Sequence, residues 1–224
     1  MHVVLADPPA FTPPYDHELA AALARAGARV ELVTSPFRFG RRPEPDGYEL
    51  VDAFYGRSSG IERDALRRAA KLLEHPLAMR RLLGRPTDVL HLQWVAVPEL
   101  DGLLLRTKRP VVFTAHDLVP RRTARRHRLW RRLFERFDRV VVHSERGRDT
   151  LAAYGVGREK LRVVPHPVFR SDPPRADDGR TVLAPGVIRA YKGLPDAVRA
   201  TLAVEGARLL VAGDPRIELA ELRR

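Results

Sequence analysis

The sequence predicts an α/β protein built on a Rossmann-like, doubly wound parallel sheet, followed by an incomplete second domain of the same kind. Short Val- and Leu-rich runs alternate with amphipathic stretches along the chain, and such alternation is typical of parallel α/β sheets. The runs are almost continuously apolar, which indicates strands buried on both faces. The alternation breaks at residues 169–180, where charges, prolines and a glycine predict a linker. We therefore expect domains over 1–168 and 181–224.

The first predicted domain begins with a buried strand and a helix that ends at a glycine. The expected elements, in order, are a strand at 2–6, a helix at 16–27, a strand at 29–34, a helix at 61–83, and strands at 88–94, 110–117, 138–144 and 160–166 with helical segments between them. The helix at 61–83 is predicted from helical spacing of small and apolar residues, namely Leu66, Ala69, Ala70 and Leu73. Residues 36–60, rich in Pro, Gly and Arg, are expected to be irregular.

The second predicted domain holds about one strand–helix–strand unit. Strands are expected at 181–188 and 207–213, with a helix near 195–204 and a last short helix after them. A single unit of this kind exposes the edges of its sheet and cannot bury both faces. We therefore expect the sequence to stop before this domain is complete.

Composition and charge narrow the function classes. The chain contains no cysteine, which excludes a disulfide framework, a thiolate metal site and a thiol nucleophile. No apolar run reaches the ~18 residues of a membrane span, and the N-terminal run is too short for a signal peptide, so we expect a cytoplasmic location. The net charge of +12 is open to two interpretations. The charge either serves to attract a polyanion such as nucleic acid, membrane or nucleotide, or reflects an arginine-rich composition that serves no partner.

The sharpest motif is PGVIRAYKGLPDAVRA at 185–200, in which a strand leads through a basic loop into a helix. Gly186 ends the strand, Gly193 precedes the helix, and the cations Arg189 and Lys192 lie in the loop between them. A helix N-terminus beside two cations is suited to bind an anion. The alternative is an ordinary strand–helix loop with solvated charges.

This run resembles the G-x-I-R-x-Y-K-G signature that opens the C-terminal domain of retaining GT-B glycosyltransferases of family 4. Three more stretches agree with the family in order and spacing, at 111–120, 138–168 and 211–215. They resemble the family's strand ending in His-Asp, its strand–helix–strand segment leading to Pro-His, and its next strand–glycine turn. The resemblance implies a GT-B fold, with an acceptor-side domain first and a donor-binding domain second.

The resemblance also implies roles for the residues of the motif. In the family, the positions of Arg189 and Lys192 hold the diphosphate of the nucleotide-sugar donor, and Gly186 and Gly193 match the signature glycines. Tyr191 stands in the usual aromatic position. The donor diphosphate site is therefore expected at these residues.

Further candidate site residues follow the predicted strands. Parallel sheets bind ligands at the C-terminal ends of their strands, where His116, Asp117, His143 and His166 are placed. Each of these residues has a purely structural alternative. In the resembled family, the histidine at the position of His116 lies beside the transferred sugar, which implies a catalytic role for it. Asp117, His143 and His166 are candidate acceptor or sugar contacts.

The first loop departs from the family pattern. Many members carry two glycines after the first strand, whereas this loop, DPPAFTPPYDHE at 7–18, has prolines and no glycine. Prolines stiffen the chain and remove N–H donors. We therefore expect the loop to shape the acceptor pocket, with Tyr15 and Asp16 as candidate polar contacts, rather than to bind the donor phosphate.

Residues 121–139 hold nine arginines against two acidic residues. An apolar stripe at helical spacing runs through them, formed by Leu129, Trp130, Leu133, Phe134 and Phe137. The favoured interpretation is a surface helix that packs this stripe onto the sheet. The alternative is a basic helix that draws the protein to anionic lipid on the inner face of the membrane.

Missing motifs exclude other chemistries. The sequence has no Asp-x-Asp of the metal-dependent GT-A transferases, no Gly-x-Gly-x-x-Gly after the first strand, no P-loop and no Gly-x-Ser-x-Gly elbow. The sequence contains no zinc-finger spacing, no RNP-like aromatic run and no basic zipper, so nucleic acid is not expected as a partner. We expect neither a metal nor another cofactor.

The resemblance implies transfer of a sugar from a nucleotide-diphosphate sugar to an acceptor hydroxyl, on a glycan or a lipid-linked molecule, with retention of configuration. Arg189 and Lys192 would stabilise charge on the departing diphosphate, and His116 would hold the sugar. The family's pair of glutamates, seven residues apart, lies further along than this sequence reaches, so we expect the chain alone to lack part of the donor site. The alternatives are a non-catalytic basic module that docks on membrane or a partner protein, and another GT-B-fold enzyme such as a sugar-nucleotide epimerase.

Overall fold

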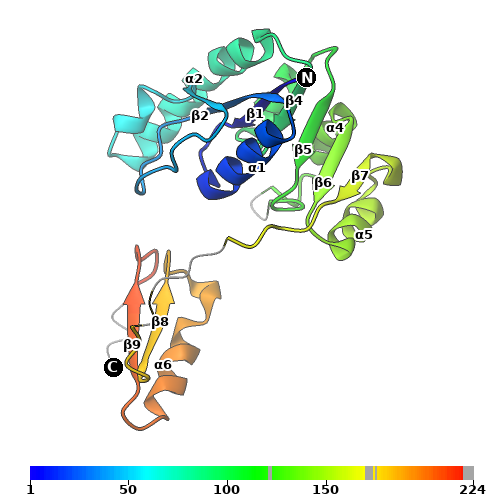
Figure 1. The fold of residues 1–224 in the computed structure, drawn as a ribbon. Helices are drawn as coiled ribbons and strands as arrows, with labels where there is room; N and C mark the ends of the chain where they lie inside the picture. The colour runs from blue at the N-terminus through cyan, green and yellow to red at the C-terminus, as the bar shows by residue number, and fades with distance from the viewer. Residues whose placement is uncertain (121–122, 170–173, 175, 219–224) are drawn as a thin grey trace. The chain divides into compact units, whose positions relative to one another are not determined.

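The chain folds into two compact units, Met1–Val168 and Phe169–Arg224 (Figure 1). The computed structural model describes residues 1–120, 123–169, 174 and 176–218. Within these ranges, none of the helices combines the length and the apolar composition needed to cross a bilayer.

The first unit is organised by a seven-stranded sheet in which every neighbouring pair of strands is parallel. Its strands are β1 (His2–Asp7), β2 (Arg29–Thr34), β3 (Glu49–Asp52), β4 (Val89–Leu92), β5 (Val111–Thr114), β6 (Arg139–Val142) and β7 (Leu161–Val163). They are arranged in the order β3-β2-β1-β4-β5-β6-β7. The chain therefore winds outward from β1 to one side and later returns to the other side, which makes the β1–β4 boundary a topological switch point. The prediction of a doubly wound parallel sheet is confirmed.

Five α-helices connect these strands among the described residues: α1 (Pro13–Arg25), α2 (Asp64–Gly84), α3 (Pro98–Leu104), α4 (His127–Arg136) and α5 (Glu145–Tyr154). Short 3-10 turns lie at Ser58–Gly60 and Arg158–Lys160. Local sequence explains several of their ends. Two prolines begin α1, where a missing N–H costs nothing. The Ser144 hydroxyl caps α5 by accepting a hydrogen bond from the Gly147 N–H, and Gly155 ends that helix with a positive φ.

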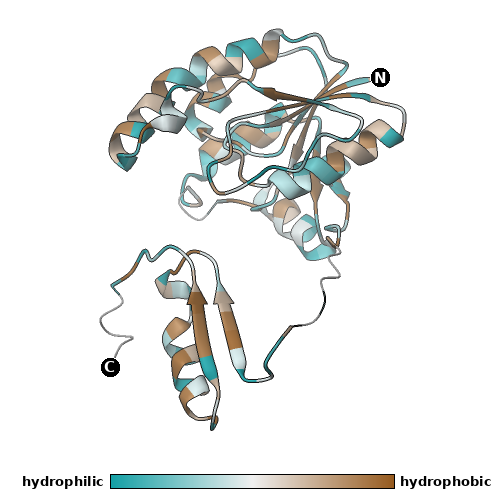
Figure 2. Ribbon diagram, turned by 60° about the vertical axis from the view of Figure 1, so that its left-hand side comes forward, coloured by the Kyte–Doolittle hydropathy of each residue, from teal (hydrophilic) through white to brown (hydrophobic). Residues whose placement is uncertain are grey.

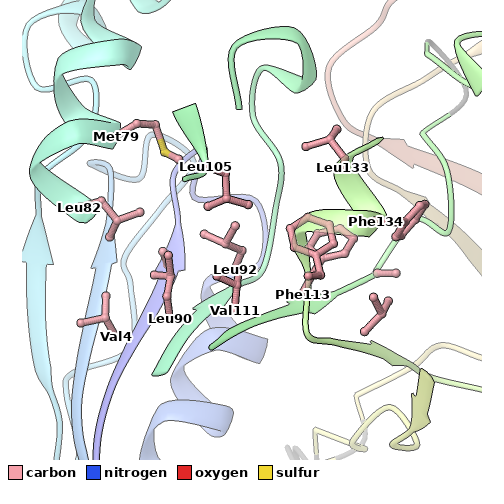
Figure 3. Close-up of a cluster of buried hydrophobic side chains, with 14 of the residues drawn as sticks. Val4, Met79, Leu82, Leu90, Leu92, Leu105, Val111, Phe113, Leu133 and Phe134 are labelled. Atoms are coloured by element: carbon pink, nitrogen blue, oxygen red, sulfur yellow. The ribbon is translucent and has the colours of Figure 1, made fainter. Parts of the chain in front are cut away.

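Two hydrophobic clusters form on the sheet. The smaller packs α1 against the first two strands, with Ala20 against Leu5, Val30 and Leu32. The larger lies under α2, α3, α4 and α5. Figure 3 shows part of it, with Met79 and Leu82 of α2 above the strand residues and Leu133 and Phe134 of α4 near Phe113. Because strands are covered by helices, their apolar runs are buried as the sequence predicted.

A buried polar network joins α2 to α3 within the larger cluster. His75 of α2 is fully buried, and its Nε2 lies 2.6 Å from Oδ1 of Asp101. Its Nδ1 lies 2.7 Å from the Tyr55 hydroxyl. The other carboxylate oxygen of Asp101 accepts a 2.9 Å hydrogen bond from the Val97 N–H. Burial, and next the charge of Asp101, raises the pKa of Tyr55, which stays a neutral hydroxyl in this network.

The structure corrects three details of the predicted elements. Residues 36–60, predicted to be irregular, contain β3, a four-residue edge strand that pairs with β2 through backbone hydrogen bonds despite its polar ends. The first helix begins at Pro13 rather than at residue 16. The last short helix was expected after residue 213, where residues 214–218 are not helical and 219–224 lie outside the described residues.

The second unit consists of β8 (Thr181–Pro185), a 3-10 turn at Ala190–Lys192, α6 (Leu194–Leu202) and β9 (Arg208–Ala212). The two strands are parallel neighbours. They are strongly hydrophobic in Figure 2, yet Val182, Leu183 and Leu210 are each more than half exposed. The turn after β9 packs tightly on the turn after β8, because a Cβ added at Gly213 would lie 1.9 Å from the carbonyl oxygen of Gly186.

Candidate functional site

A cluster of aromatic and imidazole rings lies at the C-terminal edge of the first sheet. His116 follows β5, His143 follows β6 and His166 follows β7, while Tyr15 belongs to α1. The Tyr15 ring centroid lies 4.6 Å from that of His116, 5.4 Å from that of His143 and 5.2 Å from that of His166. Four residues predicted separately from the sequence are therefore brought together around Tyr15. We call this group, with Trp94, the ring cluster.

His116 is held between two aromatic rings at the centre of the ring cluster. The Trp94 ring stacks on it at 5.1 Å with a 14° interplanar angle, and Tyr15 meets it edge-on at 87°. The Nε2 atom lies 3.1 Å from Oε1 of Gln93, so Nε2–H donates to that amide oxygen. Burial, and then the nearby His143 and His166, lowers the pKa of His116 to about 4. His116 is therefore a neutral imidazole at neutral pH.

Two polar atoms beside His116 are buried without a hydrogen-bond partner among the described residues. One is Nε2 of Gln93, an amide donor, and the other is Nε2 of His143. The opposite ring atom of His143, Nδ1, donates to the carbonyl oxygen of Val164 at 2.9 Å. Its Nε2 is consequently an acceptor when the ring is neutral. Buried polar atoms are normally hydrogen-bonded, so these two nitrogens mark positions at which a partner is missing.

A pair of buried carboxyl groups lies beside the ring cluster, at the end of β1. Asp7 and Asp16 are both buried, and each carboxyl group shifts the pKa of the other. Burial, and then the neighbouring charge, raises the pKa of Asp16 well above its usual value, and burial also raises the pKa of Asp7. Burial and mutual repulsion therefore disfavour ionisation of both carboxyl groups at the same time.

Thr12 connects this carboxyl pair to the ring cluster. Its N–H donates to Oδ2 of Asp7 at 3.2 Å, and its hydroxyl accepts a 3.0 Å hydrogen bond from the Trp94 indole. The same hydroxyl lies 3.4 Å from both carboxyl oxygens of Asp16. The loop of prolines thus folds back onto the sheet edge and fixes Trp94 over His116.

The structure separates some predicted residues from the site and adds others. Asp117 follows His116 but is exposed, outside the ring cluster. His166 is also exposed, and its ring contacts Tyr15 and His143. Gln93 and Trp94 were not predicted, although they directly follow β4 and stand at the same sheet edge as the other strand-end residues.

The predicted donor loop forms a cleft in the second unit. Gly186 and Gly193 both have positive φ, which favours glycine, and Gly193 is the N-cap of α6. Lys192 lines a cleft of ≈ 220 Å³ together with residues of both strand ends. Its Nζ lies close to Gly186, since a Cβ there would be 3.2 Å away. The Arg189 side chain is exposed and is not among the residues that line this cleft.

The basic segment at 121–139 contains α4 and the first residue of β6, with Arg121 and Arg122 outside the described residues. Its apolar side chains Trp130, Leu133, Phe134 and the adjoining Phe137 are buried, and Trp130 donates its indole N–H to the Thr123 hydroxyl at 3.0 Å. The interpretation of a surface helix packed onto the sheet is confirmed. The exposed side of α4 consists mainly of arginines. Its apolar stripe is buried and is therefore not available to insert into lipid.

Solved structures with the same arrangement of elements define the class of the protein as a GT-B-type glycosyltransferase fold. HepE from Anabaena, in complex with UDP and glucose, is 13% identical with a TM-score of 0.61, over 96% of this chain and 61% of that chain. Sucrose-phosphate synthase from Thermosynechococcus elongatus is 18% identical with a TM-score of 0.63, over 100% of this chain and 65% of that chain. A glycosyltransferase from Rickettsia africae is 14% identical with a TM-score of 0.56, over 98% and 61%. The chain thus spans about three fifths of the length of HepE.

The family of the protein is identified from its sequence. The model of Glycosyltransferase Family 4 matches residues 15–171, and the chain belongs to this family. The match includes Tyr15, His116, His143 and His166, and it ends before the donor loop at 185–200. No curated protein matches the sequence.

Proposed function

We propose that the protein transfers a sugar from a nucleotide-diphosphate sugar to an acceptor hydroxyl, with retention of configuration. The observation that carries the proposal is the ring cluster around His116, at the switch-point edge of a family 4 fold. Sheets of this kind take their ligands at that edge. The similarity to HepE, whose structures contain UDP-glucose or UDP and glucose, supports a nucleotide-sugar donor.

The hydrogen-bonding character of the ring cluster supports a sugar hydroxyl as its ligand. The open Gln93 Nε2 is a donor, and the open His143 Nε2 is an acceptor. A hydroxyl group both donates and accepts, so it is a suitable partner for either atom. Neutral His116, held between Trp94 and Tyr15, adds polar contact without burying a charge. We assign His116 to holding the transferred sugar so that its anomeric carbon faces the acceptor.

Gly186, Arg189, Lys192 and Gly193 are proposed to bind the donor diphosphate. The Lys192 ammonium lies beside the turn at Gly186, ahead of the N-terminus of α6, where positive charge and the helix dipole both favour an anion. Fixed cations of this kind stabilise the charge that develops on a departing diphosphate and contribute about 10²–10³ in rate per contact. Arg189 would turn toward the same anion from its exposed position.

The acceptor is proposed to be a glycan or a lipid-linked sugar, reached from the ring cluster. Phe11 is exposed and meets Trp94 edge-on, with centroids 5.2 Å apart. Aromatic surface with a few polar groups suits the apolar faces of a sugar ring. Tyr15, His143 and His166 are candidate contacts of this acceptor or of the transferred sugar. Asp16 and Asp7 are assigned to shaping the pocket wall, and an intracellular location, peripheral to the membrane, suits a lipid-linked acceptor.

Donor binding tests this proposal directly. The purified chain would be titrated with UDP-, GDP- and ADP-sugars by calorimetry and by thermal shift, because a ligand at ~100 times its Kd adds about 2.7 kcal/mol to the stability of the folded state that binds it. We expect one nucleotide to bind and Lys192→Ala or Arg189→Ala to weaken binding. Arg199→Ala removes an equal charge from α6, where Arg199 is exposed and pairs with Asp196, and should bind as the unchanged protein does. Absence of binding for every donor would favour the non-catalytic alternative.

A further inference from the structure

Thr12 stands at the start of α1, but its side chain does not cap the helix. A threonine at this position normally accepts a hydrogen bond from the backbone N–H of the second or third helical residue. The first two helical residues are Pro13 and Pro14, so the second has no N–H to donate. The Thr12 side chain makes no cap hydrogen bond, and its hydroxyl is therefore available for a tertiary contact.

That hydroxyl is used by Trp94, which lies 82 residues further along the chain, and whose indole Nε1–H donates to it at 3.0 Å. An indole has a single donor, so this bond and the stacking contacts of the ring orient Trp94. Thr12 is itself anchored, because its N–H donates to Oδ2 of Asp7 at 3.2 Å, and Asp7 is the last residue of the buried strand β1. The sheet thus fixes the hydroxyl, and the hydroxyl fixes the indole.

The Trp94 ring in turn restrains the tilt of the His116 imidazole. Gln93 holds Nε2 of His116 at 3.1 Å, but a single hydrogen bond restrains one atom of a ring and leaves its plane free to rotate. Trp94 restrains that plane, because it stacks on the imidazole at 14° with the centroids 5.1 Å apart. Tyr15 adds an edge-on contact at 4.6 Å. The plane of His116 therefore depends on Thr12 through Trp94.

We propose that Thr12 is a positioning residue for sugar transfer: by holding Trp94, it fixes the plane of the His116 imidazole. Groups that bind a reacting molecule must be held within roughly 10–20° of the productive orientation, and a hydrogen bond followed by a stack supplies such a restraint. The proline-rich loop at 7–18 then acts on the sugar through the rings. The consequence for sugar binding rests on the proposed function, whereas the restraint on His116 does not.

The chain contains a matched control for a purely structural role of Thr12. Trp130 is buried in the larger hydrophobic cluster and donates its indole N–H to the Thr123 hydroxyl, also at 3.0 Å. Thr123→Val therefore removes the same kind of bond from the other tryptophan and leaves the stack of Trp94 on His116 in place. A general loss of stability should follow either substitution, but a change at His116 should follow only one.

NMR of the indole and imidazole groups tests the restraint directly. The chain has two tryptophans and eight histidines, and His116→Asn identifies the His116 signals. We expect Thr12→Val to shift the Trp94 indole signal and to reduce the upfield shift that a stacked indole imposes on the His116 ring protons. Burial is the main cause of the lowered pKa of His116, so this pKa should rise by at least about 0.5, from about 4 toward 6.5.

Three comparisons show whether the effect passes through the indole. Thr12→Ser keeps the hydroxyl and should keep the His116 signals, whereas Thr123→Val should shift the Trp130 indole signal only. Asp16→Asn keeps an acceptor near the Thr12 hydroxyl and should leave the stack unchanged. The titratable groups around the imidazole remain in every variant, so a changed pKa reports on the indole; they are Tyr15, His91, His143 and His166.

A double substitution keeps the test decisive if valine at position 12 disturbs the loop. Trp94→Phe retains a ring but lacks the indole donor, and it should raise the pKa of His116 as Thr12→Val does. Thr12→Val added to Trp94→Phe should then change the His116 signals no further, because two residues that act through one bond are not additive. Additive effects would contradict a role of Thr12 through Trp94.

Ligand binding connects the restraint to the sugar. The nucleotide-sugar selected by the donor titration and the corresponding free nucleotide diphosphate would be titrated into each variant. We expect Thr12→Val to bind the nucleotide-sugar at least about threefold more weakly, as for one impaired hydrogen bond, to bind the free nucleotide unchanged, and to be rescued by Thr12→Ser.

The proposal is overturned if the His116 signals are the same in Thr12→Val and the unchanged protein, or if Thr123→Val moves them equally. It is also overturned if nucleotide-sugar and free nucleotide lose affinity in the same proportion. A chain that binds no nucleotide would refute the proposed function instead, and the NMR comparison would still decide whether Thr12 restrains His116.

Discussion

Replacing Asp101 by alanine perturbs the polar network that joins α2 to α3. The carboxylate accepts two hydrogen bonds, from His75 at 2.6 Å and from the Val97 N–H at 2.9 Å. Hydrogen bonds to a charged group contribute about 1.5–3 kcal/mol each, and His75 is left buried without this partner. We therefore expect Asp101→Ala to lower the free energy of unfolding by about 3–5 kcal/mol. For a chain of this size that corresponds to a melting temperature lower by roughly 10 °C.

Tryptophan fluorescence is a suitable assay, because both tryptophans of the chain, Trp94 and Trp130, belong to the first unit. Glu99→Ala is a matched control in the same turn of α3. Its partner is Arg126 on the surface, and exposed ion pairs contribute only about 0–1 kcal/mol. A loss below about 1 kcal/mol in Asp101→Ala, or an equal loss in Glu99→Ala, would refute the assignment of the network as a structural join.

Three further predictions concern the carboxyl pair, His116 and the turn after β9. Burial raises the pKa of Asp16, so its ionisation lowers the stability of the fold as pH rises above the usual pKa of 3.8. Asp16→Asn, which cannot ionise, should therefore melt higher than the original protein at neutral pH and lose that advantage in acid, and the reverse trend would contradict a raised pKa. The pKa of His116 is lowered from 6.5 to about 4, so the folded state loses stability as pH falls from about 6.5 to about 4. His116→Asn should therefore reduce the fall in melting temperature over this pH range, and an unchanged slope would count against a neutral imidazole. Gly213→Ala would place a Cβ 1.9 Å from the Gly186 carbonyl oxygen and should destabilise the second unit by at least about 2 kcal/mol; hydrogen exchange should increase in β8 and β9 only, whereas Gly56→Ala, with nothing within 4 Å, should leave both units unchanged.

The fold was predictable because the sequence of each buried parallel strand is a short apolar run. The exception, β3, is held by backbone pairing at the sheet edge, and its side chains carry little apolar signal. The ring cluster was predictable in part for a related reason. His116, His143 and His166 all follow strands, and parallel topology places such residues on one edge whatever the strand order.

Other parts of the site required the folded chain. Gln93 and Trp94 also follow a strand, but their types alone do not indicate chemistry. The raised pKa values of Asp7 and Asp16 depend on α1 folding back over the end of β1, which no local pattern specifies. Periodicity predicted a helix at 61–83 but could not tell which side of it meets the core, and the leucines that defined its periodicity turned out to face solvent.

The sheet order has a consequence for synthesis of the protein on the ribosome. Strand β1 lies inside the sheet and pairs with β4 from Val3↔Val89 to Ala6↔Leu92, so one of its two neighbours is translated more than eighty residues after it. Until then, β1 can pair with β2 alone and presents an open hydrophobic edge that invites pairing with other chains. A nascent chain stalled before Val89 should therefore depend on chaperones, and release from that dependence should coincide with the emergence of β4.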